Sequence, residues 1–272
     1  MLIDVFPTDT SAASRITPEK ILDVLRDFVQ IALEKNFVML VSTGKGKHRL
    51  DSSIIEESIG NSLRGFAEGH PLFTQMGLSI EMATNGTWYD FLIRSLDGSI
   101  WIPINLKVSS LEGCDDLSAK DGVFYALTGI RPTDGMTRNW DCFCRNMATH
   151  VKRNNCSADY YYLVVQKTPP GKPVGKVFWT SLLQLQRVRP NGCNPPFQCR
   201  WKENTERATQ TRQQAIDNLL NVLGQTFVQR AKALDSFRTH LVPGFAEGLK
   251  TKWFGPCLVA ATSVSDARLL GE

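Results

Sequence analysis

The feature that most constrains the fold is an Asp-Gly pair between two segments of alternating side chains. Asp97-Gly98 separates residues 88–95 from residues 100–109. An Asp-Gly pair in this setting is the strongest short signal for a two-residue β-hairpin turn. Such a loop would set these cross-strand pairs: Leu96 with Ser99, Arg94 with Trp101, Leu92 with Pro103, and Asp90 with Asn105.

This hairpin has one apolar and one polar face, because side chains alternate between the two faces of a strand. The apolar face carries Phe91, Ile93, Ile100, Ile102, Ile104 and Leu106. The opposite face carries Asp90, Asn105 and Lys107. We therefore expect a carboxylate, an amide and an ammonium group to lie side by side on the face turned away from the core.

Helical and extended patterns alternate along the rest of the chain. Thr17-Pro18 opens a helix with apolar residues at helical spacing, and Asp51 caps a second helix with the stripe Ile55, Ile59, Leu63 and Phe66. Further helices are expected over 139–153 and 208–240, strands over 78–83, 159–166 and 176–185, and a polar loop over 111–122. These elements predict an α/β (α+β) fold in which helices flank a mixed central β-sheet. We expect one domain over 1–272, with 205–272 as a candidate helical C-terminal extension.

Composition excludes several classes of protein. Hydrophobic residues make up 42% of the chain and charged residues 21%, which suits a globular protein with a buried core. No apolar run approaches the ~18 residues of a membrane span, and residues 1–15 lack the pattern of a signal peptide. The 7 cysteines are sparse and odd in number, so we expect free thiols and a cytoplasmic location.

The common cofactor motifs are missing. The sequence has no glycine-rich phosphate-binding loop, so we expect no nucleotide cofactor. The pair Cys142-x-Cys144 with Cys193 and Cys199 does not have the spacing of a structural zinc site.

Basic residues are concentrated in one part of the chain. The net charge is only +4, but residues 160–215 contain nine Lys and Arg residues and two acids, with aromatic residues between them. Such a segment is typical either of a surface that binds a phosphate backbone or of an ordinary solvated face.

The polar face of the hairpin suits metal-dependent hydrolysis of a phosphodiester. Mg²⁺ prefers oxygen ligands, often one or two carboxylates completed by water and substrate phosphate. A neighbouring ammonium group can orient the attacking water and offset the negative charge that develops on the phosphate. The alternative is a solvent-exposed hairpin face on which Asp90 and Lys107 form a surface ion pair of small energetic effect.

Several stretches around this hairpin resemble the PD-(D/E)xK nuclease superfamily. They are Asp90-x-x-Ile93-Arg94, the run Pro103-Ile104-Asn105-Leu106-Lys107-Val108-Ser109-Ser110, then Thr128-Gly129 with Thr133-Asp134-Gly135, and finally Pro243-Gly244-Phe245 with Gly248-Leu249. Within the superfamily they are most similar to type II restriction endonucleases that have asparagine at the second acidic position.

The resemblance implies a restriction-endonuclease-like core and a Mg²⁺-dependent site. It gives Asp90 as metal ligand, Asn105 at the usual acidic position and Lys107 as the catalytic lysine. The superfamily often adds an acid from the preceding helix, and here Glu57 matches by sequence while the helical wheel favours Glu56. An amide oxygen can ligate a metal but adds no negative charge, so an inactive form of the enzyme is a real alternative.

DNA contacts are expected from two regions. Arg131, Arg138 and Asn139 lie in a loop before a predicted helix, where Arg and Asn can read guanine and adenine; a plain exposed loop is the alternative. The basic segment offers contacts to the DNA backbone, and the residues predicted for it are Lys167, Arg187, Arg189, Arg200 and Lys202.

The sequence thus favours a type II restriction endonuclease that cuts double-stranded DNA at a short palindrome and leaves 5′-phosphates. A homodimer on the palindromic site is expected, with a monomer as the alternative. Two other functions stay open: a structure-specific repair or junction nuclease, and a catalytically silent sequence-specific DNA-binding protein.

Overall fold

The computed structural model describes residues 16–35, 48–84, 86–133, 135–169, 173–192 and 195–244. All the predicted site residues fall within these ranges. Asp134 and the stretch from Phe245 to Leu249 in the family resemblance lie outside the described residues.

The centre of the molecule is a mixed five-stranded sheet. Its strands are β1 (Leu78–Met82), β2 (Phe91–Ser95), β3 (Trp101–Ser109), β5 (Tyr161–Gln166) and β6 (Val177–Ser181). They lie in the order β1-β2-β3-β5-β6, and only the β3–β5 pair is parallel. The prediction of a mixed sheet flanked by helices is confirmed.

The predicted hairpin register is confirmed along β2 and β3 but changes at Asp90. Arg94 pairs with Trp101 and Leu92 with Pro103, as the Asp-Gly turn requires. The ladder stops at Phe91 and Ile104, and the predicted pair of Asp90 with Asn105 is not part of it. Asp90 and Phe91 both face Ile104, as in a β-bulge, because the Asp90 N–H also donates to the Ile104 carbonyl.

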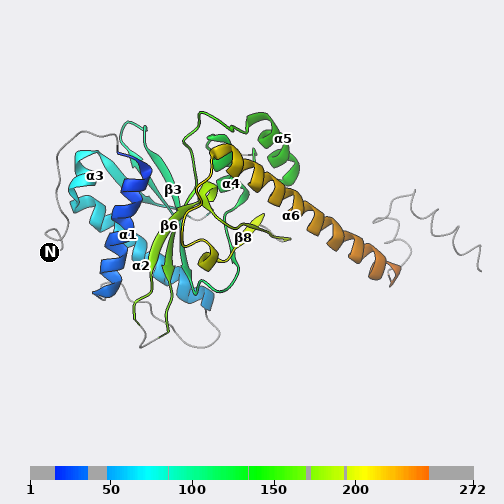
Figure 1. Cartoon of the computed structure of the whole chain (residues 1–272), viewed down its shortest axis with the longest axis horizontal. Coiled ribbons are helices and arrows are strands. Elements are labelled where there is room, and N and C mark those ends of the chain that lie inside the picture. The colour runs from blue at the N-terminus through cyan, green and yellow to red at the C-terminus, as the bar shows by residue number, and fades with distance from the viewer. Residues whose placement is uncertain are drawn as a thin grey trace, which may run out of the picture.

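One face of the sheet is covered by the N-terminal helices α1 (Pro18–Glu34), α2 (His48–Gly69) and α3 (Pro71–Gln75), as Figure 1 shows. Seven apolar residues of α1 are buried: Ile21, Leu22, Leu25, Phe28, Val29, Ala32 and Leu33. They pack with Ile55, Ile59 and Leu63 of α2 against the apolar side of the hairpin, including Phe91, Ile93, Ile102 and Ile104. The predicted apolar face packs on this core, but the expectation that the opposite face is turned away from the core is wrong. A second core, which includes Tyr162 and Val164 of β5, lies on that side of the sheet.

The opposite face carries α4 (Lys120–Thr128), α5 (Trp140–His150), α6 (Arg212–His240) and a small sheet (Figure 1). The small sheet contains β4 (Asp115–Asp116), β7 (Arg189–Pro190) and β8 (Phe197–Cys199) in the order β4-β8-β7. The prediction of a loop over 111–122 is therefore wrong, because β4 and the start of α4 lie within it. Residues 122–128 of α4 are all buried, so the helix has no polar stripe to reveal its period.

Helix α6 belongs to the core only in its first half. Ile216, Leu219 and Leu223 are buried, whereas Val228 is 55% and Leu234 41% exposed, and Figure 1 shows the second half extending away from the body. The predicted helix over 208–240 is therefore part of the core only over its first half. Short 3₁₀ turns cover Leu182–Gln184, Trp201–Glu203 and Val242–Gly244. Within the described ranges, no helix combines the length and apolarity that crossing a bilayer requires.

Candidate active site

Asp90 is held rigidly at the end of the β2–β3 hairpin. Its N–H donates to the Ile104 carbonyl and its carbonyl accepts from the Ala83 N–H, both at 2.9 Å. Its carboxylate Oδ2 accepts the Leu106 N–H at 2.7 Å. The side chain here takes the place of a backbone acceptor, which explains why the ladder does not continue to Asn105. Burial raises the pKa of Asp90, against the lowering effects of this hydrogen bond and of Lys107.

Asn105 lies on β3 with its amide oxygen unused. The Oδ1 atom is buried and has no hydrogen-bond partner among the described residues. Tyr160, a fully buried residue that immediately precedes β5, donates its hydroxyl proton to the Trp88 carbonyl at 2.7 Å. An unsatisfied buried carbonyl oxygen costs free energy and can accept a hydrogen bond or ligate a cation.

Lys107 and Glu56 complete the group around Asp90. Burial and the negative charge of Asp90 raise the pKa of Glu56 to about 7, while the ammonium group of Lys107 lowers it. Glu56 from α2 therefore faces both Asp90 and Lys107. Glu57 is exposed and is not among the groups that act on Glu56 or Asp90, so of the two predicted acids only Glu56 lies near Asp90.

The donor set at this site suits Mg²⁺. Glu56 and Asp90 are partly buried, and burial raises the pKa values of both carboxylates. These carboxylates and the unpartnered amide oxygen of Asn105 are hard oxygen ligands. In the part of the chain that the structure describes, no three His, Cys, Asp or Glu side chains gather to hold a metal by themselves. A Mg²⁺ site with two carboxylates would be completed by water and substrate phosphate.

A cleft of about 810 Å³ lies beside the residues that lead into β2. Its lining includes Trp88, Lys120, Asp121, Thr137 and Arg138. The Lys120 ammonium group donates to the Arg138 carbonyl at 3.2 Å and lies 5.2 Å from the centre of the Trp140 ring. Of the predicted DNA contacts, only Arg138 is in this cleft; Lys120 was not predicted from the sequence.

The other two predicted loop contacts are held by contacts within the protein. The Arg131 guanidinium group lies 3.6 Å above the Trp101 ring, at the start of β3. The Asn139 Oδ1 atom accepts the Cys142 N–H at 2.8 Å and caps α5. Asn139 thus has a structural role as an N-cap, which leaves only its amide N–H groups for a base.

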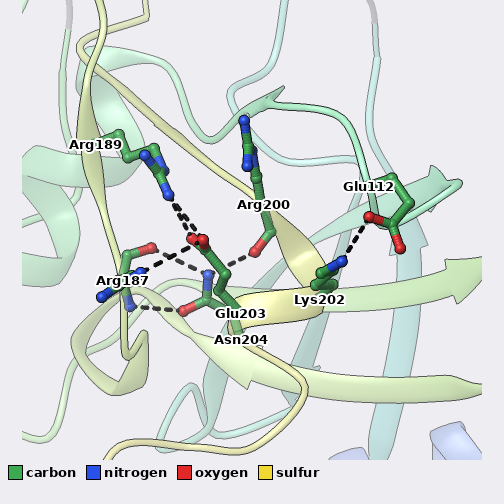
Figure 2. Close-up of polar contacts among 7 residues, drawn as sticks. All are labelled: Glu112, Arg187, Arg189, Arg200, Lys202, Glu203 and Asn204. Atoms are coloured by element: carbon green, nitrogen blue, oxygen red, sulfur yellow. Dashed lines mark hydrogen bonds and ion pairs between the residues drawn. The ribbon is translucent and has the colours of Figure 1, made fainter.

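The basic segment is folded into a network of ion pairs around the small sheet, shown in Figure 2. Arg189 binds both carboxylate oxygens of Glu203, at 2.7 and 3.0 Å, and Arg187 lies 3.6 Å from the same carboxylate. Lys202 pairs with Glu112 at 2.8 Å. In Figure 2 the Arg200 guanidinium group points away from Glu203, and only its carbonyl is bonded, to Asn204.

This network lies on the Lys107 side of the molecule. Lys107 and Glu203 both act on the pKa of Cys199 in β8, which burial raises. Lys167 is partly buried, and its backbone N–H donates to the Ser109 carbonyl at the end of β3. Arg187 and Arg189 share the one carboxylate of Glu203, while Asp115 and Asp116 of β4 place two further acids in the same small sheet.

Comparison with known proteins finds no family model that matches this chain and no curated protein with significant similarity to it.

Proposed function

We propose that this chain is a Mg²⁺-dependent type II restriction endonuclease with the core of the PD-(D/E)xK nucleases. It would hydrolyse phosphodiester bonds in double-stranded DNA at a short palindrome and leave 5′-phosphates. The observation that carries the proposal is that Glu56, Asp90 and Lys107 interact electrostatically at the end of the β2–β3 hairpin, where β3 also carries Asn105.

In this proposal Asp90, Glu56 and Asn105 would hold Mg²⁺ through oxygen atoms. When bound, the ion supplies Lewis-acid chemistry: it polarises a phosphate oxygen and lowers the pKa of water. The Lys107 ammonium group already lowers the pKa values of Asp90 and Glu56. The same positive charge would orient the attacking water and stabilise the negative charge that grows on the phosphate.

The surroundings supply groups for the DNA itself. Arg131 stacks on the Trp101 ring. Trp101 and Asn105 are four residues apart on β3, so their side chains lie on the same face of the strand, about 13 Å apart at the usual rise per residue. Arg138 and Lys120 line the cleft beside Trp88. The arginines of the network in Figure 2 would contact phosphates on the other side.

The test is cleavage of long unmodified DNA by purified protein with and without Mg²⁺. Discrete fragments are expected with Mg²⁺ and none with EDTA. Asp90→Asn should reduce the cleavage rate at least about a hundredfold, because a charged ligand is lost while the Leu106 hydrogen bond can persist. The matched control is Asp217→Asn, which removes an exposed carboxylate that pairs with Arg153.

The other outcomes separate the alternatives. Preference for a four-way junction over linear duplex would instead support a structure-specific nuclease. Specific binding to one duplex in Ca²⁺ or EDTA, without cleavage in Mg²⁺, would support a silent DNA-binding protein. Sedimentation of the complex with a duplex that carries one site distinguishes a homodimer from a monomer.

A further inference from the structure

Trp140, the first residue of α5, has a cation from each of two other helices beside its ring. The Lys120 Nζ atom of α4 lies 5.2 Å from the ring centre, and the Arg230 Cζ atom of α6 lies 4.4 Å from it. At both distances an aromatic ring attracts a cation. The three helices lie together on one side of the central sheet (Figure 1). Together they place two positive charges around one ring.

The ring and its cations are held in place before any ligand binds. Phe143 of α5 packs against Trp140 with ring centres 5.5 Å apart and planes at 83°, and Phe227 of α6 does so at 5.1 Å and 80°. The Lys120 ammonium group also donates to the Arg138 carbonyl at 3.2 Å. Long cationic side chains normally lose rotamer freedom when they bind a ligand. Contacts within the protein have already restricted that freedom here.

This cluster continues the cleft beside the candidate active site. Lys120 and Trp88 line the same cleft. Trp88 precedes Asp90 by two residues, and two residues of chain span no more than about 7 Å. A continuous surface therefore runs from Asp90 through the cleft to Trp140, and from there to α6.

The described residues of this surface carry more positive than negative charge. Lys120, Arg138 and Arg230 supply three cations. Asp121 supplies one carboxylate in the cleft, and the carboxylate of Asp141 is paired with an arginine within α5. Basic groups beside aromatic rings are the usual composition of a surface that binds a nucleic-acid backbone.

We propose that Lys120, Trp140 and Arg230 form a binding site for the phosphate backbone of DNA, separate from the metal site. The two cations contact neighbouring phosphates, and Trp140 is the positioning residue that holds them. The inference rests on the proposed function, because it takes duplex DNA as the partner and extends its path from the cleft onto α6. Phosphate contacts add affinity without reading the sequence. This site should therefore act on binding and not on the choice of bases.

Lys232 provides a matched control on the same helix. It follows Arg230 by two residues, which is about 200° around an α-helix, so the two side chains leave α6 on opposite sides. Lys232 is exposed and lines a groove together with Gly224 and Val228. Lys232→Gln thus removes the same charge from the same helix without removing a contact with Trp140.

The experiment measures binding of a fluorescein-labelled duplex DNA of mixed sequence by fluorescence anisotropy, in EDTA, over a salt series. Lys120→Gln and Arg230→Gln should each weaken binding several-fold at low salt. Each should also reduce the slope of log K against log salt by about 0.9, the value for one phosphate contact. Lys232→Gln should stay within about twofold of wild type and keep the wild-type slope.

Trp140→Leu tests the positioning role, because it removes the ring and keeps both charges. It should weaken binding, and Arg230→Gln should cost less affinity in the Trp140→Leu background than in the wild type. Equal costs in the two backgrounds would overturn the role of Trp140. If Trp140→Leu gives no cooperative melt, Trp140→Phe takes its place, with a smaller loss expected because the weaker ring is kept.

The outcomes separate this inference from the proposed function. Equal affinities and slopes for Arg230→Gln and Lys232→Gln would overturn the phosphate site, even if the wild type cuts DNA into discrete fragments with Mg²⁺. The expected losses of binding in a wild type that never cleaves would overturn the proposed function and support the phosphate site.

Discussion

The carboxyl groups at the end of the hairpin and in the arginine network of Figure 2 have opposite pKa shifts. At the hairpin, Asn105 Oδ1 has no partner in the described structure and the pKa of Glu56 is raised to about 7, chiefly by burial. In the network, Glu203 is bound by Arg189 through both oxygens, and its pKa is lowered mainly by that hydrogen bond. The difference lies in the carboxylates, because the Arg189 Nε atom of the network is likewise buried without a partner in the described structure. The Glu203 charge is matched by arginines, whereas the charge of Glu56 is left uncompensated enough to raise its pKa.

The largest expected effect comes from a comparison of two lysines, one in each region. Lys107→Ala should reduce the cleavage rate about 10²–10³-fold, the usual loss when one preorganised donor is removed from a reacting phosphate. Lys202→Ala breaks an exposed pair with Glu112 and should leave the rate constant nearly unchanged. Single-turnover cleavage kinetics measure both. Equal rates for wild type and Lys107→Ala would remove Lys107 from the chemistry.

The second effect concerns stability and pH without metal. The pKa of Glu56 is above its ordinary value in the folded protein, so its contribution to stability falls as pH rises from about 4.5 through about 7. Glu56→Gln should therefore be more stable than wild type at pH 8 in EDTA, by about 1–2 kcal/mol after allowance for solvent screening, and nearly equal at pH 4.5.

Thermal melts at both pH values measure this difference. Glu57→Gln is the control, because Glu57 is exposed on the same helix and should show no such dependence on pH. Mg²⁺ should reduce the stability difference between Glu56→Gln and wild type at pH 8, because it stabilises the wild type. If the difference in stability between Glu56→Gln and wild type is the same at both pH values, Glu56 is solvated in the folded protein.

The smallest effect tests whether the network restrains DNA binding. Glu203→Gln removes the carboxylate that neutralises Arg187 and Arg189. We expect DNA affinity to rise a few-fold at low salt, with a steeper dependence on salt concentration, because more cations are free to contact phosphates. Fluorescence anisotropy over a salt series measures both quantities. Unchanged affinity and slope would assign these arginines to structure alone.

The sequence predicted the parts of the fold that depend on local patterns. All seven apolar residues assigned to α1 are buried, and the Asp-Gly turn gave the register of β2 and β3. These features follow from side-chain periodicity and turn chemistry. The small sheet was missed, because strands of two or three residues such as Asp115–Asp116 are too short to show alternation.

The candidate site was predictable only in part, for a similar reason. Alternation placed Asn105 and Lys107 on one face, and helical spacing favoured Glu56 over Glu57. The bulge at Asp90 depends on a hydrogen bond from the Leu106 N–H to the Asp90 carboxylate. The spacing of apolar residues does not predict such a bond. The position of Asn105 opposite Tyr162 depends on a parallel pairing between distant strands, whose register the sequence does not give.

That parallel pairing has a consequence for how the chain folds. The β2–β3 hairpin is local and can form within microseconds, whereas pairing β3 with β5 must wait until α4 and α5 have brought the chain back across the sheet. Asn105 and Lys107 lie on the early element, and their ladder partners Tyr162 and Val164 lie on the late one. Folding intermediates that contain only the hairpin would therefore carry Asp90, Asn105 and Lys107 beside an open strand edge. The last step of chain assembly would be the step that covers this edge.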